Sequence, residues 1–161
     1  MYVIGVDPGP LPGIVRLWLE YGAGPTHLLE SEALQVTPRL ILPTLNMLGA
    51  GDRSTVAVEQ FVVGRRAARS STPSAGVITR TMVGVVTNWA TQNNLGDWRR
   101  SLRTRPAAEV KPWATDGRLE AAGLLEATKG MRHARDAARH ALFCAVRDYG
   151  LPDPLSRKAL L

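Results

Sequence analysis

The hydrophobic positions near the start of the chain fall into short apolar runs of the length of β-strands. Residues 2–6 (YVIGV) and 13–19 (GIVRLWL) are two such runs, separated by a turn rich in proline and glycine, and residues 26–36 continue the pattern. Three consecutive runs joined by such turns predict an antiparallel meander of three strands. A fourth, strongly apolar run at residues 54–61 (STVAVEQF) predicts another strand.

Helical spacing takes over in the rest of the chain. Thr37-Pro38 predicts the start of a helix that carries leucines at helical positions and ends at the glycines after it. Residues 75–94 have apolar side chains three and four positions apart and predict a long helix. A fifth strand is predicted within residues 98–110. Two further helices are predicted, one at residues 119–127 and one from residue 133 to Gly150.

This order of elements predicts an α/β layered fold with a mixed five-stranded sheet flanked by helices. We expect one domain at residues 1–150, followed by a loosely held tail at residues 151–161. No apolar stretch approaches the roughly 20 residues that span a bilayer, and no secretory leader is visible. The single cysteine, Cys144, excludes an internal disulfide framework. These features predict a cytoplasmic protein with no membrane partner.

The charge of the chain points towards an anionic partner. Twenty lysines and arginines stand against fourteen acidic residues, which gives a net charge of +6, and nearly all of the basic residues are arginine. Guanidinium groups match phosphate oxygens, so a partner rich in phosphate is favoured. A basic surface that is merely solvated stays open, because net charge alone does not separate the two.

Two of the apolar runs end on an acid. Asp7 follows the first run directly, and Glu59 directly follows the apolar residues Val56-Ala57-Val58 of the fourth. A buried carboxylate without a partner is unfavourable, so an acid at the end of each core strand predicts a cation between them. Neighbouring parallel strands bring their carboxyl ends to one edge of the sheet, where α/β folds place their ligands. The alternative for Asp7 is that it only caps the turn formed by Pro8-Gly9.

The last predicted helix adds further candidates. His133 and Asp136 are three residues apart and share a helical face, and His140 follows four residues later on roughly the same side. Alone, this pattern is also typical of a solvated polar face. Together with the two strand-end acids it predicts a hard-cation site of oxygen ligands and one histidine, of the kind that suits phosphodiester cleavage. A basic protein with such a site is a candidate nuclease.

Four segments carry a family resemblance: IGVDPG, VAVEQF, PAAEVKPWATDGR and HARDAARHAL. In this order and spacing, over residues 2–148, the chain resembles the RuvC Holliday-junction resolvases of the ribonuclease H-like fold. The resemblance implies two Mg²⁺ or Mn²⁺ ions per site, one activating a water and one stabilising the leaving 3′ oxygen. It implies four catalytic, metal-binding residues: Asp7, Glu59, Asp136 and His133. Family members have either Asp or His at the position that matches His133.

The resemblance also implies a set of DNA-binding residues, which follow the catalytic glutamate or lie in the EVK and DGR motifs: Phe61, Arg65, Arg66, Arg69, Lys111 and Arg118. The chain departs from the family at two places. The helix after DGR has Ala121 where many members have a lysine. Val62 stands where a base-stacking aromatic is common, and its neighbour Phe61 either replaces that aromatic or belongs to the core.

The implied activity is that of a crossover junction endodeoxyribonuclease, a homodimer that makes paired nicks in four-way junctions, forks and flaps. Residues 75–94 are the candidate dimer interface, unless their apolar side chains face the protein's own core. Compact relatives occur in bacteriophages, which would place the protein in the host cytoplasm. Three alternatives stay open: a ribonuclease H-like enzyme acting on RNA–DNA hybrids, an actin-like kinase, for which a second glycine-rich loop is missing, and a non-catalytic binder of branched DNA.

Overall fold

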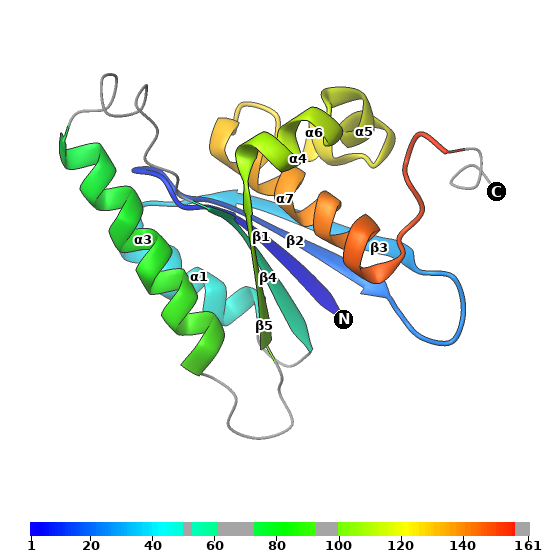
Figure 1. Ribbon diagram of the computed structural model, residues 1–161, viewed down its shortest axis with the longest axis horizontal. Helices are drawn as coiled ribbons and strands as arrows, with labels where there is room; N and C mark the ends of the chain where they lie inside the picture. The colour runs from blue at the N-terminus through cyan, green and yellow to red at the C-terminus, as the bar shows by residue number, and fades with distance from the viewer. Residues whose placement is uncertain (50–52, 61–72, 93–99, 157–161) are drawn as a thin grey trace.

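Five strands form one mixed sheet in the order β3-β2-β1-β4-β5 (Figure 1). The computed structural model describes residues 1–49, 53–60, 73–92 and 100–156. Strands β1, β2 and β3 are antiparallel neighbours, whereas β4 runs parallel to β1 and β5 runs parallel to β4. The predicted meander and the mixed five-stranded sheet are therefore confirmed. The strands are β1 (Tyr2–Asp7), β2 (Gly13–Glu20), β3 (His27–Gln35), β4 (Ser54–Gln60) and β5 (Arg100–Pro106).

Helices cover both faces of this sheet (Figure 1). The short helix η1 (Pro38–Leu40), α1 (Ile41–Leu48) and α3 (Pro73–Gln92) lie on one side. The other side carries α4 (Ala107–Trp113), α5 (Asp116–Ala121), α6 (Leu124–Ala127) and the long α7 (Arg132–Tyr149). Because both faces are covered, the middle of β1 (residues 3–6) and of β4 (residues 56–58) has no polar side chain, instead of alternating with polar residues.

The strand period of two assigns each side chain of β1 to one of two cores. Val3 packs with the α7 side, together with Val15, Leu17 and Ala57. Ile4 and Val6 pack with α1 and α3, where Trp89 closes the core. Asp7 has the same parity as Val3, so its side chain projects towards α7 and not towards α3.

Several predicted elements have different limits in the structure. The segment 98–110 is not one strand, because β5 ends at Pro106 and α4 begins at Ala107. The helix predicted at residues 119–127 is two short helices, separated at Gly123, whose φ of 72° is left-handed. The tail is not loose at its start, since Leu151 is buried and Asp153 accepts hydrogen bonds from Arg118.

The long helix α3 divides its apolar residues between two environments. Met82 and Trp89 are buried in the core formed with α1 and β4, so they are unsuited to a dimer interface. Val77 and Ile78 remain exposed, at 53% and 36%. In the described part of α3, Val77 and Ile78 are the exposed large apolar residues that keep the predicted interface role open.

Helix α7 lies directly on the backbone of β1 and β2, because glycines face it there. A Cβ on Gly13 would lie 2.1 Å from the carbonyl carbon and oxygen of His133, and one on Gly5 would lie 2.1 Å from the carbonyl oxygen of Ala137. The first turn of α7 is also tied to β3, since the His133 amide donates to Gln35 Oε1 at 3.0 Å. These contacts fix the position of the helix that carries two of the predicted site residues.

We expect Gly13→Ala to lower the free energy of unfolding by about 1–3 kcal/mol, the usual cost of overpacking a tight contact. Urea denaturation measures this change. Gly22→Ala is the matched control, because a Cβ there meets nothing within 4 Å, and we expect a change of no more than about 0.5 kcal/mol. Equal urea midpoints for the two variants would contradict the close approach of α7 to β2.

Candidate active site

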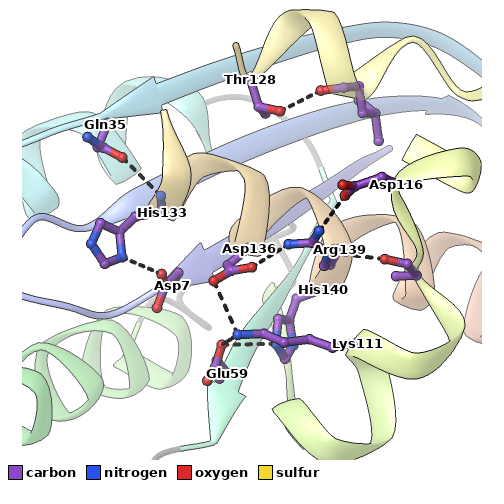
Figure 2. Close-up of polar contacts among 12 residues, drawn as sticks. Asp7, Gln35, Glu59, Lys111, Asp116, Thr128, His133, Asp136, Arg139 and His140 are labelled. Atoms are coloured by element: carbon purple, nitrogen blue, oxygen red, sulfur yellow. Dashed lines mark hydrogen bonds and ion pairs between the residues drawn. The ribbon is translucent and has the colours of Figure 1, made fainter. Parts of the chain in front are cut away.

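Two neighbouring parallel strands bring the first two acids together. Val6 of β1 pairs with Val58 of β4, so the residues that follow, Asp7 and Glu59, leave the sheet at the same edge. Asp7 and Glu59 lie an even number of residues after Val3 and Ala57, which pack on the α7 side, so both side chains project towards α7. The third acid, Asp136, comes from that helix, and Figure 2 shows Asp7 beside His133 and Lys111 between Asp136 and Glu59.

The spacing of the α7 residues explains how the helix reaches this edge. His133, Asp136 and His140 are separated by three and four residues, so they form one stripe along the helix. Ala134, Ala137 and Ala141 are fully buried beside this stripe. Small side chains let the helix approach the sheet closely, and the polar stripe therefore faces the ends of β1 and β4.

The acids are largely enclosed. The side chains of Asp7, Asp136 and Glu59 are 14%, 16% and 24% exposed. Burial raises the pKa of Asp7, and the negative charges of Glu59 and Asp136 raise it further, against the opposing effect of its hydrogen bond with His133. A carboxyl whose pKa is raised by two other carboxyls lies in a site that favours a cation.

His133 is the direct partner of Asp7. Its Nδ1 lies 2.7 Å from Asp7 Oδ2, and the ring packs close to Gly9 in the turn after β1. The amide of His133 is held by Gln35, so its backbone is fixed from one side and its ring from the other. This contact joins the end of β1 to the start of α7.

Lys111 joins the other two acids. Its Nζ lies 3.1 Å from Asp136 Oδ2 and 3.6 Å from Glu59 Oε2. Burial would raise the pKa of Glu59, but the contacts with His140 and Lys111 outweigh it and leave the pKa below its ordinary value. The pKa of Asp136 is lowered in the same way, against burial, by Lys111 and Arg139.

Packing against α7 positions the helix that carries Lys111. Val110 of α4 and Ala114, the residue that follows this helix, are buried in a small cluster with Phe143 of α7. Trp113 meets Phe143 edge to face, with ring centroids 5.3 Å apart. The location of Lys111 near the acids is thus a consequence of the apolar contacts of Val110 before it and of Trp113 and Ala114 after it.

Arg139 supports the site from the outside. Its Nη1 bonds Asp136 Oδ1 at 2.5 Å, its Nη2 bonds Asp116 Oδ1 at 2.5 Å, and its Nε donates to the carbonyl of Ala114. One side chain thereby links α7 to the ends of α4 and α5. The sequence analysis did not identify Arg139 or Gln35 as residues of the site. For Arg139, the available signal was its position three residues after Asp136 on the same helix.

The predicted DNA-binding residues have different outcomes. Phe61, Arg65, Arg66 and Arg69 lie outside the described residues. Lys111 lies among the acids, as above. Arg118 donates from Nε and Nη2 to Asp153, from Nη1 to the carbonyl of Trp113, and its guanidinium lies 4.7 Å from the Trp113 ring centroid. In this arrangement Arg118 ties the start of the tail to α4 and α5.

The acids fit a divalent cation by their chemistry, although they are not gathered around a metal position. Within residues 1–49, 53–60, 73–92 and 100–156, no three His, Cys, Asp or Glu side chains are close enough to hold an ion. Asp7 is paired with His133, and Lys111 lies between Glu59 and Asp136. Three largely enclosed carboxylates supply the oxygen donors that Mg²⁺ or Mn²⁺ prefers. Lys111, which contacts two of them, would have to move aside for an ion to bind.

Among the comparisons with known proteins, the one with solved structures identifies the fold. No family model matches the chain, and no curated protein matches it. Among solved structures, T. thermophilus RuvC in complex with Holliday junction substrate matches with a TM-score of 0.56 and 23% sequence identity. The match covers 90% of this chain and 93% of that chain. None of the helices described is long and apolar enough to cross a membrane. The chain therefore has the ribonuclease H-like fold of RuvC.

Proposed function

We propose that the protein is a metal-dependent endonuclease that resolves four-way DNA junctions by paired nicks. The observation that carries this proposal is the convergence of Asp7, Glu59 and Asp136 from two strand ends and one helix. The fold is shared with a RuvC whose structure holds a Holliday junction. The net charge of +6 suits a polyanionic substrate.

Asp7, Glu59, Asp136 and His133 would hold two Mg²⁺ or Mn²⁺ ions. The chemistry that such ions supply when bound is activation of a water nucleophile and stabilisation of the leaving 3′ oxygen. Lys111, whose side chain is 39% exposed, neutralises part of the charge of Glu59 and Asp136 and can turn outwards to a phosphate of the DNA. His133 orients Asp7 and can exchange a proton with it through Nδ1.

Paired nicks in a junction of two-fold symmetry require two sites in matching relation, which a C2 homodimer provides. Val77 and Ile78 on the outer side of α3 are the exposed apolar residues that would join the protomers. Arg65, Arg66 and Arg69 follow β4 directly in the sequence and would contact the DNA backbone. Contacts of this kind carry affinity and little sequence information, so selectivity would follow DNA shape.

Asp7→Asn and Glu59→Gln should each reduce junction cleavage by at least about 100-fold, the order of magnitude for losing one electrostatic catalytic group. Binding of the junction should stay equal or become tighter, because less negative charge faces the phosphates. Labelled synthetic junctions incubated with Mg²⁺ or Mn²⁺ measure cleavage, and gel shifts in EDTA measure binding. Glu126→Gln is the control, since Glu126 is 81% exposed and pairs only with Lys129 among the described contacts. Cleavage by either acid variant within tenfold of wild type would contradict the site.

The substrate is tested with a mobile four-way junction, a replication fork, a flap, a linear duplex and an RNA–DNA hybrid of equal length. We expect symmetric nicks in opposing strands of the junction, cleavage of forks and flaps, and little cleavage of the duplex. The departures from the family at Ala121 and Val62 favour such relaxed choice. Preferred cleavage of the hybrid would replace the resolvase function with that of a ribonuclease H-like enzyme, which the same acids would serve.

Assembly is tested by light scattering. The wild-type protein should have about twice the chain mass of 17.4 kDa, and Val77→Asp combined with Ile78→Asp should give a monomer that nicks one strand at a time. Leu29→Asp is the control, because Leu29 is 51% exposed on the edge strand β3, away from α3. A wild-type monomer at micromolar concentration with junction bound would exclude the paired-nick model.

A further inference from the structure

His140 is a polar side chain in a buried part of α7 for which the proposed mechanism has no role. The residue is 2% exposed. Its Nε2 is buried and has no hydrogen-bond partner among the described residues. The atom faces Glu59 Oε2 at a distance of 3.5 Å (Figure 2).

The surroundings of His140 give no other reason for a histidine. Ala137, Ala141 and Cys144, which lie within four residues of it on α7, are all fully buried. A buried nitrogen without a partner is unfavourable, and native proteins almost always satisfy such groups. The acceptor that the structure brings near Nε2 is the carboxylate of Glu59.

Glu59 has two positively polarised neighbours of different kinds. Lys111 approaches Oε2 from 3.6 Å, is 39% exposed, and shares its charge with Asp136. His140 approaches the same oxygen from inside the core, on a helix whose backbone is fixed against β1 and β2. Lys111 can therefore turn outwards to solvent, whereas the position of His140 is fixed by its helix. The contact that the structure gives for each of them is with Oε2.

We propose that His140 is a positioning residue for Glu59: its Nε2–H donates to Oε2 and holds the carboxylate with Oε1 directed at the place where a divalent cation binds. The clause about the cation rests on the proposed function; the contact between the two side chains does not. The present 3.5 Å separation shortens to a hydrogen bond when Lys111 leaves Oε2. Carboxylates that serve as metal ligands are commonly held in this way by a second group, whose loss weakens metal binding by about 10–100-fold.

Nitrogen-15 NMR of histidine-labelled protein tests the contact without metal or DNA. The chain has three histidines, so His27→Gln and His133→Gln assign the His140 signals. We expect His140 to carry its proton on Nε2, with a slowly exchanging resonance that shifts in Glu59→Gln and in Lys111→Met. A proton on Nδ1, or an Nε2–H resonance that is unchanged in Glu59→Gln, would overturn the proposal.

Mn²⁺ binding to the DNA-free protein, followed by electron paramagnetic resonance, tests the consequence. His140→Leu removes the donor and should weaken Mn²⁺ binding by about 10-fold or more, whereas His140→Gln keeps an N–H donor and should restore most of it. Cys144→Ala, a buried change one turn further along α7, should leave the affinity unaltered. Equal affinities for His140→Leu and wild type would overturn the positioning role.

The two experiments separate this proposal from the function on which it rests. A wild-type protein that binds no Mn²⁺ would overturn the metal-dependent mechanism, while the NMR result still decides whether His140 holds Glu59. Should His140→Leu fail to fold, as its thermal unfolding would reveal, the NMR result and the His140→Gln variant decide the question. Loss of Mn²⁺ binding in both His140→Leu and Cys144→Ala would indicate a general packing effect and overturn the specific role.

Discussion

The site depends on the direct contact between the backbone of α7 and the two strands beneath it. No side chain at Gly13 or Gly5 separates the helix from the sheet, and a methyl group at either position would collide with a carbonyl of α7. Because the helix lies this close, the stripe that carries His133 and Asp136 reaches the ends of β1 and β4. A helix held further away by ordinary side chains would separate Asp7 from His133 and Glu59 from His140, and an enclosed acid without a partner is in an unfavourable state.

Charge balance is the second constraint on this edge of the sheet. Three carboxylates lie together, and each is compensated differently: Asp7 by His133, Glu59 by Lys111 and His140, and Asp136 by Lys111 and Arg139. The pKa of Asp7 is nevertheless raised, while those of Glu59 and Asp136 are lowered. Positive charge is thus concentrated on the α4 side of the site, and the β1 side is where the acids are least neutralised.

The sequence was sufficient for the architecture and for the neighbourhood of the acids, because both follow from period and order. Apolar runs ending on Asp7 and Glu59, in strands that a layered fold makes adjacent, already imply one sheet edge. The limits of β5 and α4 were not predictable in the same way, since Pro106 and the alanines after it are compatible with a strand end or a helix start. The role of Gly13 was also hidden: a glycine that opens a strand looks like part of the preceding turn until the helix above it is known. Lys111 was predicted as a phosphate contact from its motif, but its position between two carboxylates depends on the packing of Trp113 and Phe143, which are 30 residues apart in the sequence.

The contrast between Lys111 and His140 indicates how one carboxylate can serve a site that changes its occupant. A cation on a long, partly exposed side chain compensates Glu59 and Asp136 while leaving at little cost, because its ammonium group can be solvated as it turns outwards. His140 is 2% exposed and has no such freedom, so in the proposed mechanism it would keep its contact with Glu59 whichever cation is present. Without the lysine, the acids would repel one another in the absence of metal; without the histidine, Glu59 would be free to follow the lysine out of the site. In the proposed mechanism the two residues would therefore serve different states of the same centre: Lys111 would stabilise it before a divalent cation binds, and His140 would preserve its geometry afterwards.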